Sequence, residues 1–185
     1  MDEKPTYGRY AEIPYEQMTP EQQEGYHVLM ETRGKLPGPA KIYVHNAKLA
    51  KVMGPFGGHF RKGYSLTERE REIAVCIVNS HFHTAYATNA HERAAKAAGL
   101  PADKVEAILS GLPASFTDKR EQVIYEMAIC LVNSRWVSKG LYERALEALG
   151  HVGITDVIAL MGFYTSVAMT LAFYDVPAGA TGLER

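Results

Sequence analysis

The chain has 185 residues, of which 46% are hydrophobic and 22% charged, and its formal net charge is −1. This length and balance are typical of one globular domain with a core of its own. Lys and Arg are scattered, without a basic run or a stripe of basic and aromatic residues, which argues against a nucleic-acid partner.

The N-terminal sequence MDEKPTYGRY is charged and lacks the apolar core of a signal peptide. The two cysteines, Cys76 and Cys130, both lie in apolar helical patterns. Such positions favour reduced, buried thiols over a disulfide framework. We therefore expect a cytoplasmic protein.

Residues 1–40 are predicted to be an extension with one short helix, and residues 41–185 the main helical domain. The short helix has a capping box, in which Thr19 is the N-cap and Gln22 closes the box. It is predicted to end at Arg33, because a glycine follows.

A second helix is predicted over roughly 41–53. The segment GPFGGHF, residues 54–60, is rich in glycine and proline and is predicted to break that helix. Further on, Thr67 and Glu70 form another capping box, and apolar residues follow at helical spacing through Val78.

Two more helices follow, one ending at Gly99 and one at Gly111. Similar segments then recur. CIVNS at 76–80 matches CLVNS at 130–134, an offset of 54 residues, and ERAAKAAG at 92–99 matches ERALEALG at 143–150, an offset of 51. No stretch alternates as a strand does. We therefore predict an all-α, single-domain helical bundle built from two related three-helix units.

Residues 157–174 contain no charge and reach the borderline length of a membrane-spanning helix. No Lys or Arg flanks them closely, so the usual interfacial anchors are missing. We expect a core helix, or one at a subunit interface, and no membrane partner.

The stretch HFHTAYATNAHE, residues 81–92, holds three histidines. A zinc or iron site needs three or four converging ligands. On a helix His81 and His83 would point about 160° apart, and no His-Glu-x-x-His or Cys-x-x-Cys pattern is present. The sequence therefore predicts no metal ligands, and a metal site formed by His59, His83 and His91 is the weaker alternative.

The segment from Leu66 to Gly99 resembles the superfamily of carboxymuconolactone decarboxylase and alkylhydroperoxidase D. In its peroxidase branch the helix carries Cys-x-x-Cys-x-x-x-His, with a Glu on the preceding helix. The matching positions here are Thr84, Ala87 and His91, with Glu72 at the position of the Glu. Both cysteines of the motif are replaced, and a thiol peroxidase needs a thiolate and a resolving thiol. Thiol peroxidase activity is therefore not expected.

The decarboxylase branch commonly has Tyr-Glu-Trp-x-x-His at this place. Here the Tyr and the His match as Tyr86 and His91, whereas the Glu and the Trp do not. The pattern RG…GP at residues 33–39 and GFYTSVA from Gly162 also resemble a longer subgroup. The likeness covers about residues 15–175 and implies the alkylhydroperoxidase D-like fold and a homo-oligomer, often a trimer or hexamer.

The candidate catalytic residues are His91 and Glu72. Imidazole titrates near neutral pH and can transfer a proton, and the resemblance implies that Glu72 orients it. The alternative for Glu72 is a structural role, as an exposed acid in the first helical turn that interacts favourably with the helix dipole. The alternative for His91 is also structural, as a helix histidine whose ring nitrogens are hydrogen-bonded and take no part in a reaction.

Thr84 is predicted to be the N-cap of the helix that carries His91, which would place backbone N–H donors near a bound anion. Arg33 offers a guanidinium for an anionic substrate, or simply charge at the end of its helix. The complete set of candidate substrate-binding residues is Thr84, Tyr86, Arg33, His83, His59 and Tyr164.

Two functions of different classes follow. The first is a cofactor-free lyase that decarboxylates a small organic acid, or transfers a proton in a lactone or enol, with His91 as general acid and base. The second is a family member without catalysis that binds a ligand or serves assembly. A metal-dependent lyase is a third, weaker alternative.

Overall fold

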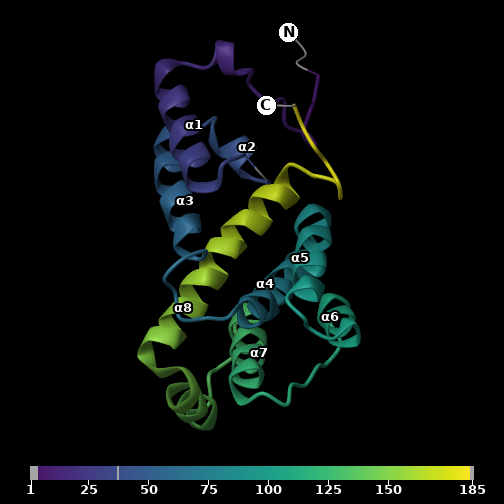
Figure 1. The fold of residues 1–185 in the computed structure, drawn as a ribbon. Helices are drawn as coiled ribbons and strands as arrows, with labels where there is room; N and C mark the ends of the chain where they lie inside the picture. The colour runs from purple at the N-terminus through teal and green to yellow at the C-terminus, as the bar shows by residue number, and fades with distance from the viewer. Residues whose placement is uncertain (1–3, 37, 184–185) are drawn as a thin grey trace. The chain divides into compact units, whose positions relative to one another are not determined.

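The computed structural model describes residues 4–36 and 38–183, and these residues form helices and no strand (Figure 1). The predicted all-α fold is therefore confirmed. In chain order the helices are η1 (Tyr15–Gln17), α1 (Pro20–Arg33), α2 (Ala40–Tyr43), α3 (Ala47–His59), α4 (Glu68–Phe82), α5 (Ala85–Ala97), α6 (Ala102–Leu109), α7 (Lys119–Val132) and α8 (Lys139–Phe173).

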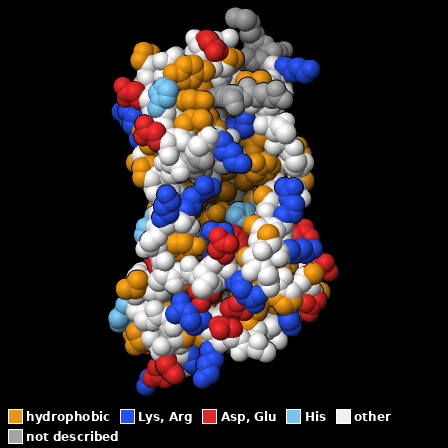
Figure 2. Space-filling view, viewed as in Figure 1, with side chains coloured by type: hydrophobic (Ala, Val, Ile, Leu, Met, Phe, Trp, Pro, Cys, Tyr) orange, Lys and Arg blue, Asp and Glu red, His pale blue; other side chains and the backbone are white. Residues whose placement is uncertain are grey.

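The chain divides into two compact units, which we describe separately. One unit comprises Met1–Tyr64 and Thr170–Arg185, and the other comprises Ser65–Met169. The last turn of α8 thus belongs to the first unit. On the face shown in Figure 2, acidic and basic side chains are interspersed over the region of α5–α7, so neither sign of charge forms a continuous field there.

Both predicted capping boxes are present. The Thr19 hydroxyl accepts from the backbone N–H of Gln22, and the Thr67 hydroxyl accepts from that of Glu70. The Glu70 carboxylate in turn accepts from the backbone N–H of Thr67 at 2.8 Å. Each box satisfies two backbone donors that a helix start leaves without partners. These local signals fix where α1 and α4 begin.

The prediction for residues 41–60 was wrong in its boundaries. Two helices occupy the region, and α3 continues through GPFGGHF to His59 with Pro55 inside it. The glycines explain this result, because they allow α3 to approach α1 closely. A Cβ at Gly54 would lie 3.3 Å from the Thr32 hydroxyl, and one at Gly58 would lie 2.7 Å from the Thr32 methyl. The glycines are therefore packing residues in α3 and not helix breakers.

In the second unit, two reciprocal ion pairs join α4 to α7. Arg69 Nε donates to Glu121 at 2.5 Å, and Arg120 Nε donates to Glu70 at 2.6 Å. Both carboxylates are buried. The dipeptide Arg69-Glu70 of α4 recurs 51 residues later in α7 as Arg120-Glu121, and so does the N-cap, as Thr67 and then Asp118. The structural repeat therefore keeps one offset of 51 residues, and the offset of 54 suggested by CIVNS and CLVNS is wrong by about one helical turn.

Helix α8 consists of two helices that meet at Gly150, whose backbone is not helical (φ 62°, ψ 179°). By length and composition α8 is apolar enough to cross a membrane, with a mean hydropathy of 1.5 over 18 residues, of which 39% are buried. One such helix is weak evidence, because the core helix of a globular protein meets the same criteria. Within the second unit, the Asp156 carboxylate of α8 accepts from Ser65 N–H and O–H at 2.8 and 2.7 Å.

Candidate functional site

A hydrogen-bonded carboxylate and imidazole join α4 to α5. Glu72 Oε2 lies 2.7 Å from His91 Nδ1. The Glu72 side chain is only 1% exposed, whereas that of His91 is 19% exposed. Because the carboxylate accepts at Nδ1, Nδ1 carries the proton and Nε2 of the neutral ring is left as a proton acceptor. The pair thus has the arrangement of a histidine base oriented by an acid.

Arg71 holds the second oxygen of the same carboxylate. Its Nε donates to Glu72 Oε1 at 2.9 Å. Burial by itself would raise the pKa of Glu72, but the hydrogen bond and charge of His91, with those of Arg71, outweigh it and lower the pKa below the ordinary value. Glu72 is therefore a buried anion, held by hydrogen bonds to both His91 and Arg71.

Two further side chains complete the surroundings of His91. The ring of Tyr164 from α8 stands edge-on to the imidazole, with centroids 4.9 Å apart and planes at 89°. The thiol of Cys76 contacts the backbone carbonyl of His91, with Sγ 3.8 Å from the oxygen. Burial first, and then the charges of Glu72 and Glu92, raise the pKa of Cys76 far above that of a free thiol. Cys76 is thus a packing residue rather than a nucleophile.

Two buried polar residues, Asn79 and Thr84, lie where α4 meets the start of α5. The backbone N–H of Thr84 donates to the Asn79 carbonyl at 3.5 Å, so the two residues are neighbours. Thr84 occupies the N-cap position, but its hydroxyl makes no cap hydrogen bond. Within the described residues, neither that hydroxyl nor the Asn79 side-chain amide has a partner, although both are buried. Buried polar groups are normally satisfied, so these two residues have hydrogen-bonding capacity to offer.

The remaining candidate residues are distributed as follows. His83 is exposed and ends α4 with a left-handed backbone, φ 50°. Tyr86 is half-buried in the first turn of α5. His59 is exposed at the end of α3, in the other unit. The backbone of Arg33 ends α1, but its side chain lies outside the part of the chain that the structure describes. The structure thus brings together Glu72, His91 and Tyr164 of the predicted set.

Sequence reasoning missed Arg71 and Asn79. Arg71 alternates with glutamates in EREREI, and nothing in that pattern shows which acid is buried or which arginine accompanies it. Asn79 has a detectable signal, since it is a polar residue at the end of the run IAVCIV, where an unsatisfied amide is costly.

No three His, Cys, Asp or Glu side chains converge as metal ligands within residues 4–36 and 38–183. His81 and His83 are both exposed, and His27 bonds the Tyr15 hydroxyl at 2.8 Å through Nε2.

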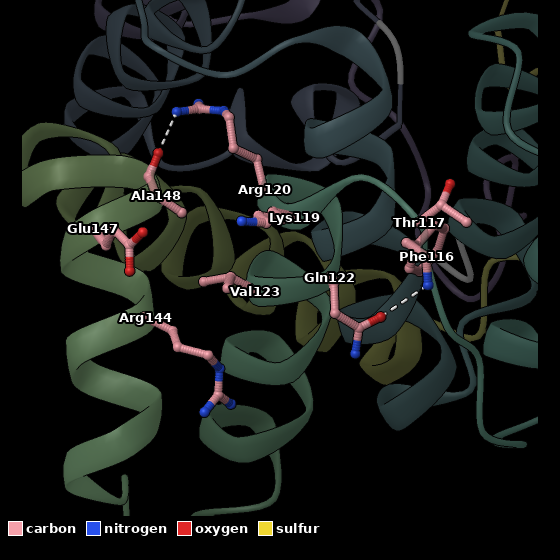
Figure 3. Close-up of a pocket in the computed structure, with 9 residues that line it drawn as sticks. All are labelled: Phe116, Thr117, Lys119, Arg120, Gln122, Val123, Arg144, Glu147 and Ala148. Carbon is pink, nitrogen blue, oxygen red and sulfur yellow. Dashed lines mark hydrogen bonds between the residues drawn. The ribbon is translucent and has the colours of Figure 1, made fainter.

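A groove of about 520 Å³ lies elsewhere in the second unit, between the start of α7 and the first half of α8 (Figure 3). Its arginines are already engaged. Arg120 donates to Glu70 and to the Ala148 carbonyl, and Arg144 donates to Glu126. The described residues that line this groove include no histidine. It therefore offers less acid–base chemistry than the Glu72–His91 pair.

No protein-family model matches the sequence, and no curated protein sequence matches it significantly. Solved structures do share its fold. An uncharacterized peroxidase-related protein from Silicibacter sp. TM1040 superposes with a TM-score of 0.73 at 18% identity, over 97% of this chain and 95% of that one.

The debrominase Bmp8 is a second structural neighbour. A variant in complex with 2,3,4-tribromopyrrole gives a TM-score of 0.70 at 14% identity, over 91% of this chain and 90% of that one. The apo form gives 0.68 at 16% identity, over 91% of each chain. The fold is of the alkylhydroperoxidase D type. At these identities the likeness concerns the fold alone.

Proposed function

We propose that the protein is a cofactor-free enzyme of the lyase type, which transfers protons during decarboxylation or lactone and enol conversion of a small organic acid. The observation that carries this proposal is the Glu72–His91 pair, with its 2.7 Å hydrogen bond and the buried anion behind it. The peroxidase-related and debrominase neighbours support an enzyme-type fold.

In this proposal His91 Nε2 takes the proton from the substrate carbon or hydroxyl, and the positive charge that develops is stabilised by Glu72. In a decarboxylation the C–CO₂ bond breaks and its electron pair forms an enolate. The imidazolium then returns its proton to the enolate carbon. Neither step requires a thiol, in keeping with Thr84 and Ala87 at the cysteine positions of the peroxidase motif.

The start of α5 would bind the far end of the substrate. Thr84 and His91 are seven residues apart, so they share a helix face and lie about 10 Å apart along the axis. That separation is too long for Thr84 to contact the same oxygen on which His91 acts. The Thr84 hydroxyl and the first backbone N–H groups of α5 suit a remote carboxylate instead.

The test is proton exchange and turnover in D₂O, followed by NMR on a panel of lactones and β-keto acids. We expect deuterium incorporation at the carbon that gains the proton, and a loss of about 100-fold or more in His91→Ala. Glu72→Gln should lower the turnover rate by about 10-fold, because His91 loses its anionic partner. Glu126→Gln is the matched control, because that α7 carboxylate is bonded to Arg144 and Gln122 and not to a histidine.

Two results would contradict the proposal. Exchange that persists in His91→Ala would remove His91 from the reaction. A wild-type protein that neither exchanges nor converts any member of the panel would favour a ligand-binding or assembly protein without catalysis.

A further inference from the structure

Trp136 is the chain's single tryptophan, and it is 92% exposed in the loop between α7 and α8. The loop is held in place by its backbone, since Arg135 N–H donates to the Cys130 carbonyl at 2.9 Å. The Cys130 thiol also lies 3.5 Å from the Trp136 carbonyl oxygen. An ordered loop that presents a bare indole to water is typical of a contact site.

An uncharged groove of about 280 Å³ lies in the same unit, large enough to accept an indole. The ends of α4 and α7 and the middle of α8 form it. Two of its residues, Leu131 and Val132, directly precede the loop that carries Trp136. The full lining is Phe82, Leu131, Val132, Ile158, Met161, Gly162 and Thr165. The exposed Trp136 side chain and the apolar groove are thus close in sequence and belong to the same unit.

We propose that Trp136 of one copy inserts into this groove of a second copy, in a pair with two-fold symmetry. Its own groove does not hold it, because the side chain is almost fully exposed. A two-fold axis allows both Trp136 side chains to enter both grooves in one contact. The lining of the groove contains no charged side chain, so the indole would desolvate no ion there.

A stable pair needs more apolar surface than the indole alone supplies. One indole buries on the order of 200 Å², against roughly 800 Å² per partner in a stable interface. Two further apolar side chains, Ile129 of α7 and Met169 of α8, are exposed on the helices that form the groove. This inference goes beyond the proposed function and does not depend on it.

The single tryptophan makes the pair directly observable. Light scattering and tryptophan emission are measured over one concentration series of the full chain. We expect the mass to double, and the emission to shift to shorter wavelength over the same range, because the indole leaves water only in the pair. Trp136→Ala should weaken association by about 30-fold or more, as a central aromatic anchor does.

A second variant fills the groove from the other side. A Cβ at Gly162 meets no atom within 4 Å, and leucine favours a helix over glycine, so Gly162→Leu should fold normally and yet block the groove. Gly140→Leu, the same change elsewhere in α8, and Leu112→Ala, which removes another exposed apolar side chain, are the controls and should associate as the wild type does.

Three results would overturn the proposal. One is a protein that stays monomeric over the whole series. Another is an assembly in which the Trp136 emission remains that of an indole in water. The third is a Gly162→Leu variant that associates as strongly as the wild type.

Discussion

Among the three acids Glu68, Glu70 and Glu72, the sequence could not show which are buried. Glu68 is exposed, whereas Glu70 and Glu72 are buried with different partners. Helical spacing alone leaves this open, because these residues precede the apolar run whose period defines the buried face. The burial of Glu72 depends on α5, which brings His91 to it. A family pattern pointed to the pair, but only packing shows that the carboxylate is a buried anion.

The lowered pKa of Glu72 has a consequence for stability. An acid whose pKa falls on folding stabilises the folded state above its unfolded pKa, and this stabilisation is lost as the pH falls through the folded pKa. Near neutral pH we therefore expect Glu72→Gln to lower the free energy of unfolding by about 1–3 kcal/mol. The difference should shrink as the pH falls below the ordinary carboxyl value of 4.5.

Urea unfolding of both proteins across this pH range measures the difference. Glu143→Gln is the control, since that carboxylate is 59% exposed and pairs with Lys139 of its own helix. A difference between wild type and Glu72→Gln that does not change with pH would show that Glu72 is not held as an anion.

At the scale of the element, helix starts were predictable and helix interiors were less so. The boxes at Thr19 and Thr67 are local, so four residues suffice to identify each of them. Helix α3 was not predictable in the same way. Its glycines break helices in isolation, yet here Gly54 and Gly58 allow contact with Thr32 of α1. That contact is tertiary, and it outweighs the local propensity.

The junction of α4 and α7 gives a prediction at this scale. Arg120→Met leaves the Glu70 carboxylate, which is 4% exposed, without its charged partner. We expect a loss of about 3 kcal/mol in the free energy of unfolding, as for one half of a buried pair. Adding Glu70→Gln should restore part of this loss, because glutamine keeps the capping box and removes the unpaired charge.

Lys139→Met is the matched control for Arg120→Met. It breaks an ion pair whose side chains are 86% and 59% exposed, so a loss below about 1 kcal/mol is expected. Chemical denaturation of the wild type and the three variants gives these values. Equal losses in Arg120→Met and Lys139→Met would show that the α4–α7 ion pair contributes no more to the free energy of unfolding than an exposed pair does.

At the scale of the whole chain, the repeat explains the symmetry of the second unit. The N-cap, one Arg-Glu dipeptide and a glycine of positive φ, Gly99 and then Gly150, all recur after 51 residues. The sequence match CIVNS and CLVNS obscured this register, because apolar residues recur every three or four positions in any amphipathic helix. N-caps and ion pairs define the register of a repeat better than matching apolar residues do. A cap or an ion pair forms only when its residues occupy particular positions.

Described segments close to both ends of the chain meet in the first unit at Glu12. Its buried carboxylate accepts from Lys41 Nζ at 3.0 Å, from the Thr6 hydroxyl at 3.1 Å and from the backbone N–H of Leu183 at 2.5 Å. The residue before Leu183 is Gly182, with φ 69°, and a Cβ there would collide with the same carboxylate. The position therefore requires glycine both for its backbone and for its contact.

Gly34 is a matched position for testing that contact, since it has the same φ of 69° and no atom within 4 Å of its Cβ. Gly34→Ala should cost only the left-handed strain, about 1 kcal/mol. Gly182→Ala should cost that strain and a further 1–3 kcal/mol or so, because the carboxylate must move away from Lys41. Unfolding free energies, together with hydrogen exchange at Leu183, measure the difference. Equal costs at the two glycines would mean that Glu12 does not hold the chain ends together.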